Sequence, residues 1–208
     1  MYATEKFKSS NIVLEKLYKR ALEDFKGHLK DATNPSIIYV TDLVSCSQKR
    51  EFRLKYPELT FKFEPSHVLG NMVHLGLEEV LKEEGYDVEV EFEKDITIDS
   101  RKVKVKGRVD AINENYIIEI KTARSDLGLP HEHHLMQLQI YLNAFNRKAG
   151  ILIYITPDRL AEYYVERKPL DLESLVAEVM YNSVHPRWNW ECKYCPFAKM
   201  CPYRVVEK

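Results

Sequence analysis

Three side chains near the middle of the chain have the types and spacing of a phosphodiester-cleaving site. Asp110 ends one alternating stretch, and Glu119 and Lys121 lie two positions apart in the next apolar stretch. In an extended strand, a spacing of two places both side chains on one face. Two carboxylates can hold a divalent cation that activates water, and an ammonium group can stabilise the charge of a phosphate transition state.

A simpler interpretation is an exposed strand with a surface salt bridge between Glu119 and Lys121. A lone D…ExK pattern is common and by itself favours this interpretation. However, the two charged residues interrupt an otherwise apolar strand, where an unpaired charge would be costly. The sequence Asn113-Glu114-Asn115 also predicts a turn, which would fold the strand of Asp110 onto that of Glu119.

Two predicted helices carry further polar candidates. His74 follows Gly70 by four positions, beside the apolar stripe of its helix, and Gln137 and Tyr141 are four positions apart and share one helix face. Each signal alone is weak, since a single helical histidine is more often structural than functional.

Four short motifs occur in the order typical of the RecB-like nucleases, which this sequence therefore resembles. They are G-x-x-x-H (Gly70 to His74), G-R-V-D (Gly107 to Asp110), E-I-K (Glu119 to Lys121) and Q-x-x-x-Y (Gln137 to Tyr141). The resemblance implies that Mn²⁺ or Mg²⁺ is bound by His74, Asp110, Glu119 and the backbone carbonyl of Ile120. It implies that Lys121 is catalytic together with Asp110 and Glu119, and that Gln137 and Tyr141 place a DNA strand near the metal.

The four cysteines form a compact triplet and one distant member. Cys192, Cys195 and Cys201 lie within ten residues, whereas Cys46 precedes them by 146 positions. Zinc sites more often use two short paired spacings, while an iron–sulfur cluster can use one distant thiolate. Spacing alone leaves zinc and an iron–sulfur cluster equally open, with unligated thiols as a third possibility.

An early cysteine and a late triplet on either side of RecB-like motifs resemble the iron–sulfur nucleases. A chain of 208 residues with this arrangement is similar to the CRISPR-associated family among them, the fourth Cas family, over about residues 41–203. The resemblance implies a cluster, 4Fe-4S, on all four cysteines. It also implies a 5′-to-3′ exonuclease, with endonuclease activity as well, acting on single-stranded DNA or single-stranded ends. Its role would be to process DNA ends for CRISPR spacer acquisition, with CRISPR integrase proteins as partners and a homo-oligomer as a further expectation.

Two other functions stay open. One is a general DNA repair or recombination nuclease, and the other is a non-catalytic adaptor whose iron–sulfur cluster is structural and which docks on the CRISPR integrase. The intact set of Asp110, Glu119 and Lys121 argues against the adaptor. No Walker phosphate loop occurs in the sequence, which excludes a helicase.

A row of cations leads up to Asp110. Its members alternate with apolar residues or glycine and would share one strand face: Lys102, Lys104, Lys106 and Arg108. Such a row suits a phosphate backbone, so these residues are candidates for DNA binding. The preceding strand carries Glu89, Glu91 and Glu93 at the same period, so the cations are equally expected to pair with acids across the strands.

The order of the expected elements predicts an α/β fold, in which helices flank a mixed β-sheet that positions the candidate residues. Such a fold resembles the restriction-endonuclease-like core of RecB-like nucleases. Helices are expected over about 11–30, 42–56, 66–84, 135–145 and 172–181, and strands over 86–98, 102–111, 116–121, 150–156 and 163–166. Ser66 is a candidate cap for a helix with Leu69, Val73, Leu77 and Leu81 on its core face. We expect one integrated domain in three parts: a helical region (1–60), the nuclease core (61–184) and a cysteine-rich flap (185–208).

The bulk composition limits the function classes. The 31 Lys and Arg residues nearly balance the 32 Asp and Glu residues, so overall charge gives no argument for nucleic acid. No apolar run approaches the roughly 18 residues of a membrane span. The first 25 residues mix charges of both signs, unlike a signal peptide. The sequence therefore predicts a cytoplasmic protein, in which cysteines are ligands rather than disulfides.

Overall fold

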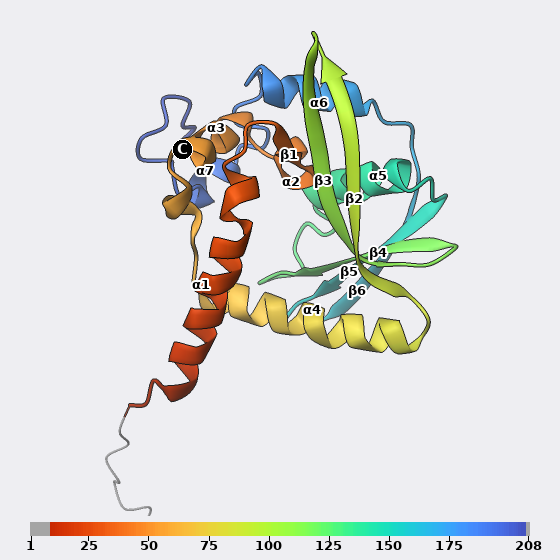
Figure 1. Cartoon of the computed structure of the whole chain (residues 1–208). Coiled ribbons are helices and arrows are strands. Elements are labelled where there is room, and N and C mark those ends of the chain that lie inside the picture. Colours follow the sequence, from red (N-terminus) through yellow and green to blue (C-terminus); the bar gives the residue numbers. More distant parts are fainter. Residues whose placement is uncertain (1–8, 207–208) are drawn as a thin grey trace, which may run out of the picture.

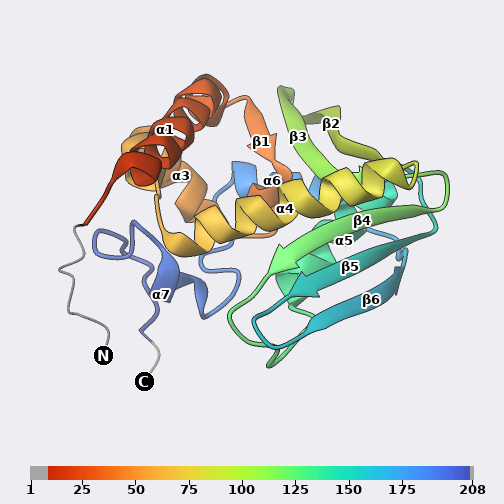
Figure 2. The same cartoon turned by 90° about the horizontal axis from the view of Figure 1, so that it is seen from below.

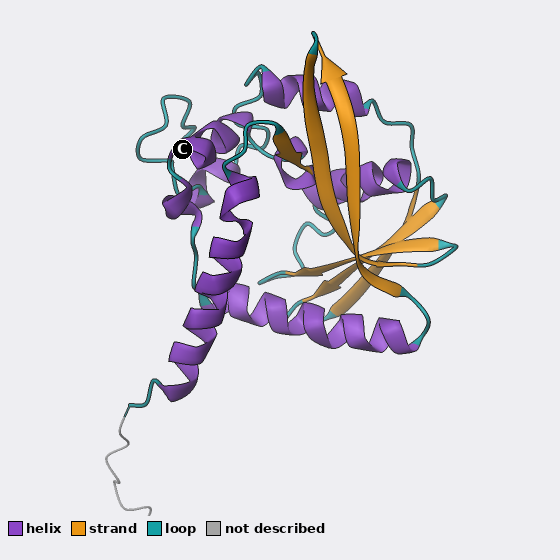
Figure 3. Cartoon of the chain, viewed as in Figure 1, coloured by secondary structure: helices purple, strands orange, loops and turns teal. Residues whose placement is uncertain are grey.

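The computed structural model of the chain describes residues 9–206. Its helices and strands alternate in the order expected of a mixed α/β protein (Figure 3). In chain order they are α1 (Ile12–Ala32), β1 (Ile37–Tyr39), α2 (Val40–Leu43), α3 (Ser47–Lys55), η1 (Pro57–Thr60), α4 (Pro65–Glu83), β2 (Asp87–Ile98), β3 (Arg101–Ile112), β4 (Tyr116–Thr122), α5 (Glu132–Ala144), β5 (Ala149–Ile155), β6 (Leu160–Glu166), α6 (Leu172–Met180) and α7 (Glu191–Tyr194). Within these residues, no helix has the length and apolarity needed to cross a membrane.

The strands form one mixed sheet, which confirms the predicted fold class. Its order is β1-β3-β4-β5-β6, with β2 paired along the length of β3. The pairs β1–β3 and β4–β5 are parallel, and the remaining pairs are antiparallel. The long β2–β3 hairpin rises out of the plane of β4, β5 and β6 (Figure 1).

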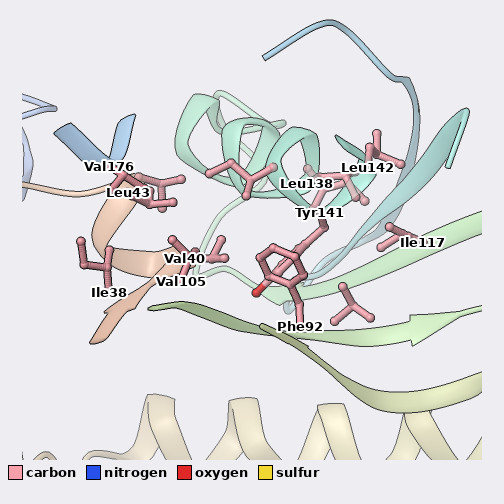
Figure 4. Close-up of a cluster of buried hydrophobic side chains, with 14 of the residues drawn as sticks. Ile38, Val40, Leu43, Phe92, Val105, Ile117, Leu138, Tyr141, Leu142 and Val176 are labelled. Atoms are coloured by element: carbon pink, nitrogen blue, oxygen red, sulfur yellow. The ribbon is translucent and has the colours of Figure 1, made fainter. Parts of the chain in front are cut away.

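Helices cover both faces of this sheet. On one face α4 packs on β4 through Val73, Leu77 and Leu81, which contact the buried Ile118 and Ile120. On the other face α2, α5 and α6 enclose the larger core. In Figure 1 α4 lies below β4 and α5 above it, and in the view from below in Figure 2 α4 is in front of the strands and α5 behind them. Figure 4 labels part of that core: Ile38, Val40, Leu43, Phe92, Val105, Ile117, Leu138, Tyr141, Leu142 and Val176.

The β2–β3 hairpin bends next to Asp110. Val105 and Val109 contact the core of α5, whereas Ala111, two residues further on, belongs to the core of α4. Directly opposite Asp110 lies Glu89, whose φ of +51° is uncommon for a residue with a side chain. The change of face at this point turns the hairpin away from β4, so the two parts of the sheet separate beside Asp110.

Two details of the sequence-based elements were wrong. The helix expected over 42–56 is interrupted, because Cys46 adopts an extended conformation (φ −57°, ψ 121°) at the N-terminus of α3. The short strand β1, which precedes this helix, was not predicted. It lies within residues 1–60, which were expected to be a helical region, and it pairs with β3.

The core face of α4 was also misassigned at its N-terminal end. Leu69 is 59% exposed, and Ser66 does not cap the helix, which begins at Pro65 after Glu64. Four residues make slightly more than one helical turn, so each step of four shifts the side chain by about 40° around the helix axis. Three such steps separate Leu69 from Leu81, and the two side chains therefore point in clearly different directions.

Gly107 is required where β3 meets α5. A Cβ atom at this position would lie 2.7 Å from Cε1 of Tyr141 and 2.7 Å from Cγ2 of Val40. We therefore expect Gly107→Ala to lower the free energy of unfolding by about 1–3 kcal/mol, as overpacking does in other cores. Urea denaturation measures this effect.

Gly76 in α4 provides the control, because a Cβ there meets nothing within 4 Å. Gly76→Ala should leave stability unchanged or raise it by up to about 1 kcal/mol, since alanine favours a helix over glycine. Equal effects of the two substitutions would show that Tyr141 and Val40 make room for the methyl group.

Candidate active site between two diverging strands

The candidate site lies in a fork between β3 and β4. The two strands pair only through Ala111 with Ile118 and Ile112 with Ile117, next to the Asn113 turn. In that register Asp110 is the next residue opposite Glu119. The strands separate there, and the backbone amide of Ile120 donates to Oδ2 of Asp110 at 2.6 Å. The carboxylate of Asp110 thus accepts the hydrogen bond that a backbone carbonyl of a paired strand would otherwise accept.

Glu119 and Lys121 form a buried pair beside this fork. Glu119 is 1% exposed, and Nζ of Lys121 donates to its Oε2 at 2.8 Å. Its other oxygen, Oε1, is buried without a hydrogen-bond partner among the described residues. Burial raises the pKa of Glu119, although Lys121 opposes the shift. An orphaned carboxylate oxygen in this setting is a suitable ligand for a cation.

Lys121 keeps its charge in spite of its burial. Loss of solvent alone would lower the pKa of Lys121, but the carboxylates of Glu119 and Asp110 more than compensate and raise it. The ammonium group is therefore a fixed positive charge at the edge of the fork.

His74 approaches the fork from α4. Its Nδ1 lies 3.2 Å from Oδ1 of Asp110, and the hydrogen bond between them raises the pKa of His74. Burial would raise the pKa of Asp110, but the contact with His74 and the charge of Lys121 outweigh it, so the pKa is lowered. Gly70 lets α4 come close, because a Cβ there would lie 3.3 Å from Oγ1 of Thr122.

A carboxylate of α4, not predicted from the sequence, also reaches this site. Glu78 follows His74 by one helical turn, and its Oε1 lies 3.6 Å from Nδ1 of His74. One ligand atom each from His74, Glu78 and Asp110 lies within 4.8 Å of the others. The only sequence signal was the spacing of four residues. Carboxylate oxygens and an imidazole nitrogen suit a divalent cation such as Mn²⁺ or Mg²⁺, so the residues present fit a metal.

Gln137 and Tyr141 lie on α5, on the other side of the fork. Tyr141 is buried, and its hydroxyl accepts a hydrogen bond from the amide of Arg108 at 3.2 Å. Gln137 lines the cavity that contains the cysteines. The structure therefore places Tyr141 against β3 and Gln137 in the wall of the cysteine cavity, and contact of either with DNA stays a prediction.

Every cation of the row on β3 is paired with a carboxylate. The nearest distances are 2.7 Å for Lys102 with Asp95, 2.7 Å for Lys104 with Glu93, 2.8 Å for Lys106 with Asp31 and 3.0 Å for Arg108 with Glu89. The contacts of Lys102, Lys104 and Arg108 agree with the expected pairing across strands, whereas Lys106 lies nearest to Asp31 of α1, with Glu93 of β2 at 3.0 Å. A role of the row in binding DNA stays a prediction, and its local charge is largely balanced.

The four cysteines line one cavity of about 310 Å³. Cys46 comes from the segment before α3, whereas the other three come from residues 192–201. Burial raises the pKa of Cys46 to about 11 and also raises that of Cys195, so without a metal these thiols stay protonated. Four cysteines lining one cavity fit a tetrathiolate-bound metal group, either zinc or an iron–sulfur cluster.

The two cysteine segments are joined by hydrogen bonds that involve no sulfur. Glu191, 8% exposed, accepts from the amide of Cys46 at 2.9 Å through Oε1. Its Oε2 accepts from the amides of Arg187 and Trp188. The indole of Trp188 donates to the carbonyl of Val44 at 2.8 Å. We call this joint, between residues 44–48 and 182–191, the latch.

Comparisons with known proteins agree with this geometry. A family model described as the PD-(D/E)XK nuclease superfamily matches residues 81–202. The chain is 46% identical to the CRISPR-associated exonuclease Cas4 of Saccharolobus solfataricus, over 94% of this chain and 100% of that protein. The crystal structure of SSO0001 is similar with a TM-score of 0.87 and 44% identity, over 94% of this chain and 98% of that chain. The chain therefore belongs to the PD-(D/E)XK nuclease superfamily and, within it, to the Cas4 family of CRISPR-associated exonucleases.

Proposed function

We propose that this nuclease cleaves DNA with a divalent metal ion held in the fork by His74, Asp110, Glu119 and the backbone carbonyl of Ile120. The observation that carries the proposal is the contact of His74 from α4 with Asp110 at the end of β3. The buried Glu119 of β4 lies close enough to both for their charges to affect its pKa. A bound Mn²⁺ or Mg²⁺ would activate a water molecule and neutralise phosphate charge.

The backbone of β4 supports the inclusion of Ile120. Its amide points into the fork, where it meets Asp110. In an antiparallel ladder, the amide and the carbonyl of one residue point to the same neighbouring strand. The carbonyl of Ile120 therefore faces the fork as well, on the side that β3 has left.

Lys121 would stabilise the negative charge that develops on the phosphate. Its ammonium group is held at 2.8 Å by Glu119, so it is positioned before substrate binds. Such a prepositioned charge costs little reorganisation during the reaction. Asp110 would serve two purposes, since Oδ2 fixes the backbone of Ile120 while Oδ1 faces His74.

For the substrate, we propose single-stranded DNA or single-stranded DNA ends, degraded from 5′ to 3′ in preparation for CRISPR spacer acquisition, with integrase proteins as partners. The relative named as a CRISPR-associated exonuclease supports this biological setting. Gln137 lines the cysteine cavity, and Tyr141 on the same helix contacts β3 at Arg108, which supports a role for α5 in guiding the strand.

For the cysteine cavity, we propose a 4Fe-4S cluster bound by Cys46, Cys192, Cys195 and Cys201. The shared cavity and the resemblance to iron–sulfur nucleases support it. No cysteine reaches the fork in this proposal, so the cluster would hold the flap on the core while the divalent ion serves cleavage.

The function is tested with linear single-stranded DNA that carries a label at its 5′ or its 3′ end. We expect cleavage with Mn²⁺ or Mg²⁺ and none with excess chelator. The 5′ label should appear at once in short products, whereas the 3′ label should remain on a fragment that shortens progressively. Duplex DNA and circular single strands serve as controls for strandedness and for endonuclease activity. Cleavage in chelator would contradict the metal site, and the reverse order of label release would contradict only the polarity.

A further inference from the structure

We propose that Glu78 is an additional carboxylate ligand of the divalent metal ion, contributed by α4 together with His74. This inference rests on the function proposed above. It assigns a metal-binding role to a residue outside the four sequence motifs, and it gives the centre a third carboxylate besides Asp110 and Glu119.

The first support is the position of Glu78. It lies four residues after His74, so both side chains leave the same face of α4. Oε1 of Glu78 and Oδ1 of Asp110 both lie near the same atom, Nδ1 of His74, at 3.6 and 3.2 Å. The three ligand atoms are close enough to one another to share one ion.

The second support is the burial of this carboxylate among other acids. Glu78 is 8% exposed, and within residues 9–206 the one basic group within 4 Å is the imidazole of His74. Arg108 is the other nearby cation, but Glu89 pairs with it at 3.0 Å. Glu89 and Asp110 add negative charge around Glu78.

The carboxylates of Glu78 and Asp110 are therefore not fully neutralised by the positive charge around them. The distance of 3.6 Å between His74 and Glu78 exceeds that of a good hydrogen bond, and one proton on Nδ1 can serve only one of its two carboxylate neighbours. Buried carboxylates are stable when they are paired or when they coordinate a metal. A divalent cation between Glu78, His74 and Asp110 would supply the missing positive charge.

A purely structural role makes a different prediction. If Glu78 only orients His74, its replacement by a neutral side chain of equal size would displace the imidazole. The metal would then lose the nitrogen of His74 as a ligand and would lose no carboxylate ligand. If Glu78 binds the ion directly, its replacement should weaken binding while His74 remains a ligand. These two roles are therefore distinguishable by asking whether the imidazole nitrogen still contacts the metal.

The test measures binding of Mn²⁺ to the full chain by electron paramagnetic resonance, which counts the free ion. Glu78→Gln is compared with Glu79→Gln, its exposed neighbour on the same helix, and with Asp110→Ala. We expect Glu78→Gln to raise the Kd for Mn²⁺ by at least about 10- to 100-fold, since residues that only hold metal ligands in place already have effects of that size. Glu79→Gln should bind as the wild type does. Pulsed measurements on the remaining complex should still detect the nitrogen of His74.

Three results decide the matter. Wild-type affinity in Glu78→Gln, with binding lost in Asp110→Ala, would overturn this inference and leave the proposed function intact. Loss of the nitrogen signal in Glu78→Gln would overturn direct ligation in favour of positioning. Failure of the wild type to bind Mn²⁺, or indifference to Asp110→Ala, would overturn the proposed function itself.

Glu78→Asp keeps the test decisive if the glutamine variant does not fold, which thermal denaturation in chelator establishes. This second variant retains the charge but withdraws it by one methylene group. Its affinity for Mn²⁺ should fall below that of the wild type, and unchanged affinity would again contradict ligation.

Discussion

Replacing Asp110 with alanine should reduce DNA cleavage by about 1000-fold or more, which is the largest effect that we expect from one side chain. The substitution removes the carboxylate that joins β3, β4 and His74. Loss of the ion forfeits several kcal/mol of transition-state stabilisation, and about 4 kcal/mol corresponds to roughly 1000-fold. Cleavage of labelled DNA under single-turnover conditions measures the change, beside direct binding of Mn²⁺.

Two further variants separate the metal from the fold. Alanine also leaves the buried amide of Ile120 without its acceptor, which costs about 1–3 kcal/mol of stability. Asp110→Asn keeps an oxygen for that amide and removes only the charge, so it should fold normally and remain inactive. Asp95→Ala, at an exposed ion pair with Lys102, should cleave as the wild type does. Full activity of Asp110→Asn would refute the assignment of this carboxylate.

Lys121→Ala provides the complementary result. Since we assign Lys121 to transition-state charge and not to coordination, this variant should retain Mn²⁺ while turnover is lost. Retention of both would reduce Lys121 to the structural partner of Glu119.

Replacing Cys195 with alanine should remove iron and sulfide from the protein and strongly destabilise it. The cluster would link Cys46 to residues 146 or more positions later, and a cross-link over so long a loop contributes about 5 kcal/mol on the loop-entropy account. For a chain of this length, that corresponds to a fall in Tm of roughly 10–20 °C. Elemental analysis after anaerobic purification and a thermal scan measure the two effects.

Asp110→Asn is the matched control for this experiment, because it alters the other centre. It should keep its iron, whereas Cys195→Ala should keep its affinity for Mn²⁺ at temperatures where it is folded. Stoichiometric zinc without iron in the wild type would refute the cluster and leave the arguments about Asp110 untouched.

Local patterns predicted the fold class and most of its elements. The period of two in β2 and β3 and the asparagine turn before Tyr116 sufficed for the antiparallel part of the sheet. The strand β1 was missed because its three residues are too few to show a period, and it is stabilised by pairing with β3. The helix break at Cys46 was missed for a related reason, since its amide is held by Glu191, which is distant in sequence.

The candidate site was foreseen as a set of residues but not as a shape. A register that places Asp110 beside Glu119 follows from the turn, whereas the separation of the strands depends on the backbone at Glu89 and on Tyr141 packing against Gly107. Glu78 escaped notice because one glutamate among several on an exposed-looking helix carries no signal until its neighbours are known. The cations of β3 could be predicted in contrast, because both their alternation and the alternating glutamates of the preceding strand are evident in the sequence. Glu89 and Glu93 do pair with Arg108 and Lys104.

The latch has a consequence for the time course of synthesis. Cys46 leaves the ribosome at least 146 residues before Cys192, which at about 5–20 residues per second is an interval of roughly 7–30 s. Throughout that interval the amide of Cys46 and the carbonyl of Val44 lack the partners that Glu191 and Trp188 later supply. The strands between them close over shorter separations and can fold in the meantime. A nascent chain arrested before residue 182 would thus already contain the carboxylates of the fork. The thiol of Cys46 would still be exposed, because the three later cysteines would not yet have been synthesised.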